Sequence, residues 1–175
     1  KKKYKNSKLC GKVYELKQTI KLKLNYHKLP TIDVVVPTYR KNEYIKDTIN
    51  SILAQKYPMK KIKIIISVNG GDETYYKYLK KYYKNKQNVK VIFTNKRGPS
   101  TARNNTKKYL KSDFVTYLDD DDLYTESFLL DLAKNVKNDT TILCGKICNM
   151  DEKNNIYNED TYINRVIAQN SDEYT

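Results

Sequence analysis

The sequence predicts an α/β fold built around a mostly parallel sheet with helices on both faces. Short apolar runs rich in β-branched residues recur along the chain, and between them apolar residues return every three or four positions. Strands that alternate with helices in this way form βαβ units, whose parallel strands are covered on both sides. The length of 175 residues suits one domain with a short extension.

Each expected element has its own local signal. The strands are apolar runs, several of them closed by proline, glycine or aspartate, at residues 32–36, 62–68, 89–94, 114–118 and 141–148. The helices are marked by apolar residues at helical spacing or by a proline start: Ile45, Ile49, Ile52 and Leu53; Tyr75, Leu79 and Tyr82; the segment from Gly98 to about Leu110; and Phe128, Leu129, Leu132, Ala133 and Val136. Thr38 or Asn42 is expected near the start of the first helix.

Positive charge is concentrated at the beginning of the chain. Residues 1–28 contain ten lysines and one glutamate, which is +9 of the net charge of +14. Apolar residues at helical spacing there predict a basic amphipathic extension over residues 1–28, followed by the domain over residues 29–175. This extension is expected either to pack against the domain or to lie on an anionic membrane surface. Nucleic-acid binding is not expected, because the domain has little excess charge and no nucleic-acid motif.

The composition also excludes several kinds of chemistry. The three cysteines form no CxxC pair, which favours free thiols in the reducing cytoplasm. No stretch reaches the roughly 20 apolar residues of a membrane helix, and the N-terminus lacks the apolar core of a secretory signal. His27 is the only histidine and precedes the domain, so a histidine-rich zinc site and a Ser-His triad are not expected.

Polar segments follow the expected strands, and a parallel sheet should gather them. The carboxyl ends of parallel strands lie at one edge, where ligands bind in open α/β sheets. The segments are Pro-Thr-Tyr-Arg at 37–40, Val-Asn-Gly-Gly at 68–71, Asn-Lys-Arg-Gly at 95–98 and four aspartates at 119–122.

The four consecutive aspartates are the strongest functional signal. Adjacent carboxylates repel one another unless cations bind them. Hard oxygen ligands suit Mg²⁺ or Mn²⁺, and such ions usually complete their shells with substrate phosphates. The position directly after an apolar strand favours a metal site. The alternative is a solvated acidic turn in which Asp122 caps the next helix.

A second candidate element runs from Gly98 to Asn104. Pro99 and Ser100 at a helix start leave backbone N–H groups free, which suits a phosphate. Arg103, one turn later, is placed to reach a phosphate or a base. A plain helix start with a surface arginine is the alternative.

These blocks together resemble glycosyltransferase family 2. The resemblance covers residues 32–151 in three blocks that keep their order and spacing: VVVPTYRKNEYIKDTINSILAQKYP, IIISVNGGDET and NKRGPSTARNNTKKYLKSDFVTYLDDDDLY. It implies a Rossmann-like GT-A fold, of which this chain is the N-terminal, nucleotide-sugar-binding portion. The acceptor half of that fold is expected to be lacking.

The resemblance places the nucleoside at the first two strand ends. The segment that holds the base and ribose in the family is matched by Pro37, Thr38 and Tyr39. The turn after the second strand usually offers an aspartate to uracil, and Val68 stands in its place here. Asn69 and Asp72 are the candidates to compensate, so UDP is the favoured but not the only expected nucleotide.

The resemblance places the diphosphate and its metal at the later segments. Arg103 matches the helix start that contacts the nucleotide. Asp119, Asp120 and Asp121 match the family's DxD region, which places Asp119 or Asp120 near the ribose. Asp121 matches the direct ligand of Mn²⁺ or Mg²⁺.

The implied reaction is metal-dependent transfer of a sugar from a nucleoside-diphosphate sugar, with inversion, to a glycan or lipid-linked acceptor in polysaccharide biosynthesis. The cation would stabilise the charge on the departing diphosphate. A carboxylate base would deprotonate the acceptor hydroxyl. Glu159-Asp160 has that chemistry, although an exposed turn is the other interpretation. The expected location is the cytoplasm, with contact at the inner membrane face.

Two other functions compete with transfer. A catalytically inactive module that binds a nucleotide sugar or glycan is favoured by Val68 and by the lack of an assigned base, and opposed by the intact Asp121. A nucleotidyltransferase would need a glycine-rich loop after the first strand, and residues 37–40 contain no glycine.

Overall fold

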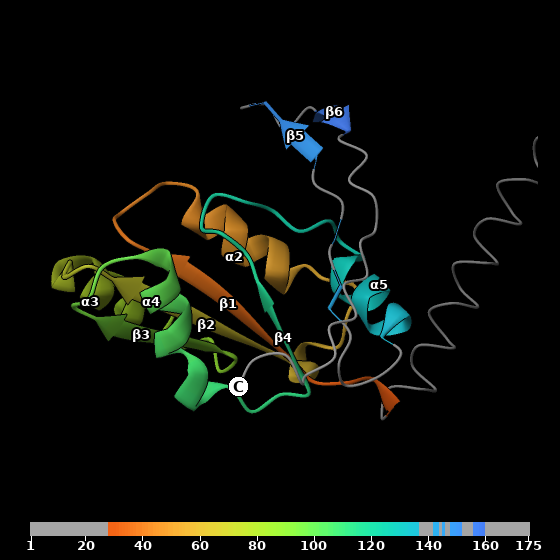
Figure 1. Ribbon diagram of the computed structural model, residues 1–175, viewed down its shortest axis with the longest axis horizontal. Helices are drawn as coiled ribbons and strands as arrows, with labels where there is room; N and C mark the ends of the chain where they lie inside the picture. Colours follow the sequence, from red (N-terminus) through yellow and green to blue (C-terminus); the bar gives the residue numbers. More distant parts are fainter. Residues whose placement is uncertain (1–27, 137–141, 144, 146–147, 152–155, 160–175) are drawn as a thin grey trace, which may run out of the picture.

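The fold centres on a parallel sheet of four strands. The computed structural model describes residues 28–136, 142–143, 145, 148–151 and 156–159. The sheet has the order β3-β2-β1-β4, shown in Figure 1, and its strands are β1 (Ile32–Thr38), β2 (Ile62–Asn69), β3 (Val89–Thr94) and β4 (Phe114–Tyr117). The expected basic extension over residues 1–28 lies outside the described residues, except for Lys28.

Helices alternate with these strands as expected for βαβ units, and the last of them follows β4. They are α2 (Ile45–Leu53), α3 (Glu73–Tyr82), α4 (Pro99–Asn105) and α5 (Phe128–Asn135), with 3₁₀ turns at Met59–Lys61 and Lys107–Tyr109. The chain moves outward from β1 through β2 to β3 and then returns to place β4 on the other side of β1. Ligands bind in α/β sheets at such a reversal of strand order, beyond the carboxyl ends.

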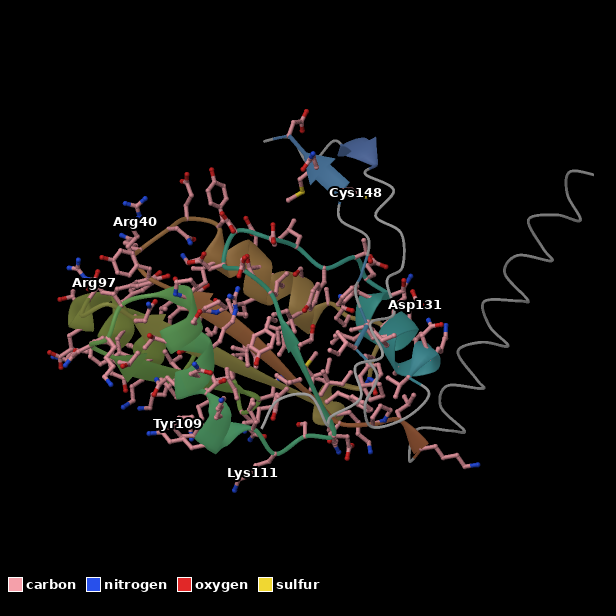
Figure 2. The ribbon with its side chains drawn as sticks, viewed as in Figure 1. Arg40, Arg97, Tyr109, Lys111, Asp131 and Cys148 are labelled. Atoms are coloured by element: carbon pink, nitrogen blue, oxygen red, sulfur yellow. The ribbon has the colours of Figure 1, made fainter. Side chains whose placement is uncertain are left out.

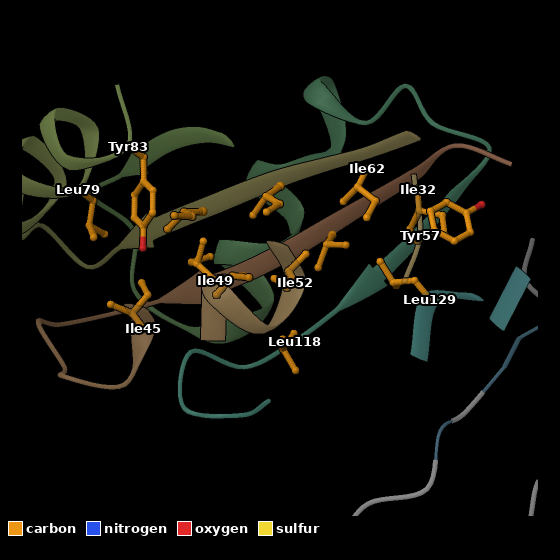
Figure 3. Close-up of a cluster of buried hydrophobic side chains, with 14 of the residues drawn as sticks. Ile32, Ile45, Ile49, Ile52, Tyr57, Ile62, Leu79, Tyr83, Leu118 and Leu129 are labelled. Carbon is orange, nitrogen blue, oxygen red and sulfur yellow. The ribbon is translucent and has the colours of Figure 1, made fainter. Parts of the chain in front are cut away.

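The main core lies on one face of the sheet. Alternate residues of β1 and β2, among them Val34, Val36, Ile64 and Ile66, pack there against α2, α3 and α5. Figure 3 shows this cluster, with the isoleucines of α2 set between Leu79 and Tyr83 on one side and Leu129 on the other. The intervening residues Val35 and Ile65 face the opposite side, where they pack with Ile92, Tyr109 and Leu110. Both faces of the sheet are therefore covered.

One polar atom in this core has no partner. Thr48 of α2 is fully buried, and its hydroxyl makes no hydrogen bond within the described part of the chain. A helical threonine usually bonds the carbonyl four residues earlier, but the Tyr44 carbonyl already accepts from the amides of Asp47 and Thr48, at 2.8 and 3.0 Å.

Replacement of Thr48 by valine should therefore raise the free energy of unfolding by about 1 kcal/mol, because it removes an unsatisfied hydroxyl and keeps the shape. Urea denaturation measures the change. Thr48→Ser is the control: it keeps the hydroxyl and loses a methyl group, so it should be less stable than the parent. A valine variant no more stable than the serine variant would contradict this interpretation of the core.

The first strand is longer than expected. We expected it to end before Pro37, but β1 continues through Pro37 to Thr38 and pairs with Ser67 and Val68 of β2. The pairing of β1 with β4 ends at Val35. Beyond that point β1 has one neighbour instead of two, so the missing N–H of a proline is tolerated.

Two further expectations need comment. The strand expected at residues 141–148 lies partly outside the described residues; of those that are described, Ile142, Leu143 and Gly145 belong to no strand, and Cys148 begins β5 (Cys148–Met150), which pairs antiparallel with β6 (Ile156–Glu159) in a separate two-stranded sheet. Apolar content alone does not set where a strand starts or which partner it finds. Asp122 does not cap α5, because that helix follows Ser127. Its amide instead donates to the Asp119 carbonyl at 3.2 Å, which folds the aspartates into a turn.

Candidate functional site

The strand ends converge on a cavity of about 460 Å³. It lies at the carboxyl edge of the sheet, beside the β1–β4 reversal. We call the turn of the four aspartates at residues 119–122 the acidic turn. The lining residues come from the ends of β1 and β2, from the segment that leads into α4 and its first turns, and from the acidic turn: Pro37, Thr38, Tyr39, Asn69, Arg97, Gly98, Pro99, Arg103, Asp119, Asp120 and Asp121. The residues predicted to bind the nucleotide and the metal all surround this cavity, except for the alternative candidate Asp72: they are Pro37, Thr38, Tyr39, Asn69, Arg103, Asp119, Asp120 and Asp121.

Tyr39 forms an aromatic surface at the cavity. Its side chain is 43% exposed and lies directly against Gly70, where an added β-carbon would come within 2.1 Å of the ring. The guanidinium of Arg97 lies over the ring at 6.0 Å from its centroid. Figure 2 shows Arg97 and Arg40 at the same end of the molecule. An exposed ring held in this way is suited to stack against a planar base.

Asn69 offers a fixed polar group beside Tyr39. The residue is buried, and its side-chain amide donates to the Gly98 carbonyl at 3.0 Å. A carbonyl only accepts, so this bond fixes the NH₂ group and leaves the Asn69 amide oxygen as an acceptor. Val68 points into the core, and the Asp72 carboxylate accepts from the Tyr75 amide at 2.8 Å as the cap of α3. Of the two candidates to compensate for Val68, only Asn69 lines the cavity.

Arg103 is held in place by two neighbours. Its Nη2 lies 2.9 Å from Oδ1 of Asp119, and its guanidinium lies over Tyr117 at 5.7 Å from the ring centroid. Both members of the ion pair are partly exposed, so it adds little to stability. The ion pair instead orients the guanidinium of Arg103 at the cavity, next to the Asp119 carboxylate.

Asp120 is bonded to the end of β1 and to the following loop. Its Oδ2 accepts from the Thr38 hydroxyl and, at 2.6 Å, from Nδ2 of Asn42. The Tyr75 hydroxyl lies 3.4 Å from that of Thr38. Burial raises the pKa of Asp120, the Thr38 bond lowers it, and the nearby charge of Asp121 raises it again. The pKa of Tyr75 is raised too, mainly by burial.

Asp121 is the carboxylate left for a ligand. It is exposed, lines the cavity, and makes no hydrogen bond or ion pair with any residue of the described chain. Burial, followed by the charges of Asp121 and Asp119, raises the pKa of Asp122. No group of three or more His, Cys, Asp or Glu side chains gathers as a metal cage in the described segments. A cation carried by a diphosphate needs only one or two protein carboxylates, which the acidic turn provides.

Three contributors were not identified from the sequence. Asn42 is predicted from sequence only to lie near the start of the first helix, and it does accept from the Ile45 amide there at 2.8 Å. Tyr75 was assigned to helix packing, and Arg97 was included only as part of a strand-end segment. No local pattern marks contacts such as Asn42 with Asp120, because they join segments 78 residues apart.

Comparison with known proteins decides the family. The model of glycosyl transferase family 2 matches residues 33–173. This chain belongs to that family. The match confirms the resemblance of the sequence blocks, and the parallel sheet with its flanking helices is the GT-A, Rossmann-like arrangement.

Relatives of this chain include two poly(ribitol-phosphate) glycosyltransferases. The poly(ribitol-phosphate) β-N-acetylglucosaminyltransferase TarS of Staphylococcus aureus is 32% identical over 102 residues, which is 57% of this chain and 18% of TarS. A poly(ribitol-phosphate) β-glucosyltransferase of Bacillus spizizenii is 28% identical over 119 residues, covering 66% of this chain and 19% of the relative. The chain thus spans less than a fifth of the length of these two proteins.

A solved structure of the same family has this fold. A crystal structure of S. aureus TarS residues 1–349 in complex with UDP-GlcNAc matches with a TM-score of 0.52 and 30% identity, over 59% of this chain and 30% of that one. Within the described residues of this chain, no helix is long and apolar enough to cross a membrane. Glu159 of the sequence-predicted base lies at the end of β6, and Asp160 lies outside the described residues.

Proposed function

We propose that the cavity binds a nucleoside-diphosphate sugar and that this chain is the donor-binding part of a glycosyltransferase. The observation that carries the proposal is the convergence of an aromatic surface, a fixed arginine and an uncommitted carboxylate on one cavity. A nucleotide sugar carries groups that suit these residues, namely a planar base, a ribose diol and a charged diphosphate. Membership of the family supports the same ligand class.

The residues divide between the two ends of that ligand. Tyr39 stacks on the base, and the Asn69 oxygen accepts a hydrogen bond from it. Uracil, which presents one N–H donor, suits such an acceptor, and UDP-GlcNAc in the TarS crystal supports a uridine nucleotide as the first candidate. Arg103 and Asp119 lie at the diphosphate and ribose end.

Asp121 would hold Mn²⁺ or Mg²⁺ together with the diphosphate. When bound, the cation supplies positive charge that stabilises the leaving nucleoside diphosphate. The chain's own contribution is to hold Asp121 at the cavity and to place Arg103 beside it. Transfer with inversion to a glycan or lipid-linked acceptor is the reaction we assign to the whole enzyme, with the acceptor base outside the donor site.

The alternative is a module that binds the nucleotide sugar without turning it over. It is favoured by one observation: among the described residues, every carboxylate at the cavity belongs to the acidic turn, so none is set apart to act on an acceptor. Incubation with UDP-GlcNAc and detection of released UDP separates the two. Hydrolysis or transfer would exclude the inactive module.

The donor site is tested by calorimetric titration of UDP with and without Mn²⁺. We expect binding that depends on Mn²⁺, and we expect Asp121→Ala to weaken it by about tenfold or more, since a metal ligand is lost. Asp131→Ala is the control: Asp131 is an exposed aspartate of α5, far from Arg97 in Figure 2, so its loss should leave binding unchanged.

Each alternative result has a defined meaning. Metal-dependent binding of GDP or dTDP but not of UDP would support the proposed donor site, with a base other than uracil bound at Asn69. Binding that is equal with and without Mn²⁺ would exclude the metal role of Asp121. Absence of binding by all three nucleotides in the presence of Mn²⁺ would overturn the proposed function.

A further inference from the structure

The four aspartates of the acidic turn do not share one environment. Asp119 pairs with Arg103 on the α4 side, and Asp121 is exposed at the cavity. Asp120, between them, is half-buried and turns towards β1, where Oδ2 accepts from Thr38 and Asn42. The turn is thus anchored through its second member, and the anchor decides where the first and third carboxylates lie.

Asn42 uses both ends of its side chain in this anchor. Its Oδ1 accepts from the Ile45 amide at 2.8 Å in the first turn of α2, and its Nδ2 donates to Asp120 at 2.6 Å. A backbone N–H only donates, so the Ile45 bond fixes which end of the amide is the oxygen. The NH₂ group is therefore directed at Asp120. We call the Asn42–Asp120 hydrogen bond the brace.

We propose that Asn42 is a positioning residue of the donor site: through the brace it holds the acidic turn so that Asp119 and Asp121 face the cavity. This inference rests on the proposed function, because it assigns a cause to the geometry of that same site. Thr38 contributes to the same anchor from β1, where its hydroxyl donates to Asp120 and lies 3.4 Å from the Tyr75 hydroxyl. The amide of Asn42 is fixed at its other end, and it ties the turn to α2.

The brace makes a prediction that a simple helix cap does not. Aspartate caps helices as well as asparagine does, so Asn42→Asp keeps the bond to the Ile45 amide. The same change replaces the donor to Asp120 with a second carboxylate, which repels Asp120. We expect thermal stability close to that of the parent, and Mn²⁺-dependent UDP binding weakened about tenfold, as is usual for loss of a group that orients a metal ligand.

A double replacement restores the pair with its roles exchanged. With Asn42→Asp and Asp120→Asn together, the new amide at position 120 donates to the new carboxylate at position 42. The effect of Asn42→Asp should therefore fall from about tenfold in the parent to within about threefold in the Asp120→Asn background. Asn50→Asp is the matched control, because Asn50 is exposed on α2 and its change adds the same charge away from the turn.

Hydrogen exchange of the amides of residues 119–123 gives a readout that needs no nucleotide. Exchange should speed up in Asn42→Asp, and return towards the parent rate in the double variant, while Asn50→Asp should match the parent. If the parent binds no nucleotide, the proposed function is wrong, and the exchange data still test whether the brace holds the acidic turn. Parent-like exchange and binding in Asn42→Asp, or a loss that the double variant does not repair, would overturn it.

Discussion

Replacement of Asp33 by alanine is expected to lower the free energy of unfolding by about 3–5 kcal/mol. Asp33 is a fully buried carboxylate at the second position of β1. Its Oδ2 accepts from the amides of Lys111 and Ser112 at 2.8 and 3.1 Å, and its Oδ1 accepts from the Ser112 hydroxyl at 2.9 Å. Lys63 Nζ lies 3.9 Å from the same Oδ1. The carboxylate thereby fastens the segment that leads into β4 against the sheet.

The loss is large because the groups around Asp33 depend on it. Without the carboxylate, the two amides and the hydroxyl lose their acceptor, and Lys63 loses its counter-charge in a partly buried position. These bonds join β1 to the segment directly before β4, which pairs with β1 through its own backbone. A change of this size is a considerable share of the roughly 5–15 kcal/mol that stabilises a typical domain.

Urea denaturation of three variants tests the assignment. Asp33→Asn keeps one acceptor oxygen and should lose less stability than Asp33→Ala. Asp113→Ala is the matched control, since that exposed carboxylate accepts from the amide and hydroxyl of Thr31 at 2.7 and 2.8 Å at the same junction. Its loss should be much smaller, because water replaces the bonds. Equal losses for Asp33→Ala and Asp113→Ala would show that burial is not the cause.

Replacement of Gly70 by alanine is expected to weaken UDP binding by about tenfold. The new β-carbon would lie 2.1 Å from Cε2 of Tyr39, so the ring must leave its place against the turn. Because Tyr39 is partly exposed, its ring can be displaced towards solvent at little cost in stability, but the aromatic surface is then lost from the cavity. Stacking of a base on an aromatic ring contributes about 1–3 kcal/mol, which makes a tenfold effect reasonable.

Gly71 provides the matched control for this experiment. Gly71 has a similar backbone conformation, with φ of +95° compared with +87° at Gly70, but nothing lies within 4 Å of the β-carbon it would acquire. Both alanine variants should lose about 1 kcal/mol of stability through the positive φ. Only Gly70→Ala should lose affinity in calorimetric titration of UDP with Mn²⁺. Equal affinities would remove Tyr39 from the proposed base site.

The fold was largely predictable because its signals are local. Three of the four strands of the parallel sheet start and end within a residue of where the apolar runs predicted them, and α2 follows the spacing of Ile45, Ile49 and Ile52. The exceptions depend on neighbours. Pro37 remains in β1 because β4 stops short of it, and Cys148, at the end of the run expected over residues 141–148, belongs to a separate antiparallel pair.

The candidate site was predictable as a set of segments but not as a set of contacts. The rule that strand ends meet at one edge was enough to predict that Tyr39, Asn69, Arg103 and the aspartates lie together. That rule did not distinguish the aspartates from one another. It also gave no role to Asp33, a single polar residue within an apolar run.

The sequence by itself determined the alternation of strands and helices, the family, and which segments line the candidate site, because hydrophobic period and short motifs are properties of neighbouring residues. The tertiary structure alone decided that Asp119 pairs with Arg103, that Asp120 is tied to Asn42, and that Asp121 is left open. Those differences depend on strand order and on packing between segments far apart in the chain. Consecutive identical residues acquire separate roles only when the fold surrounds each with different neighbours.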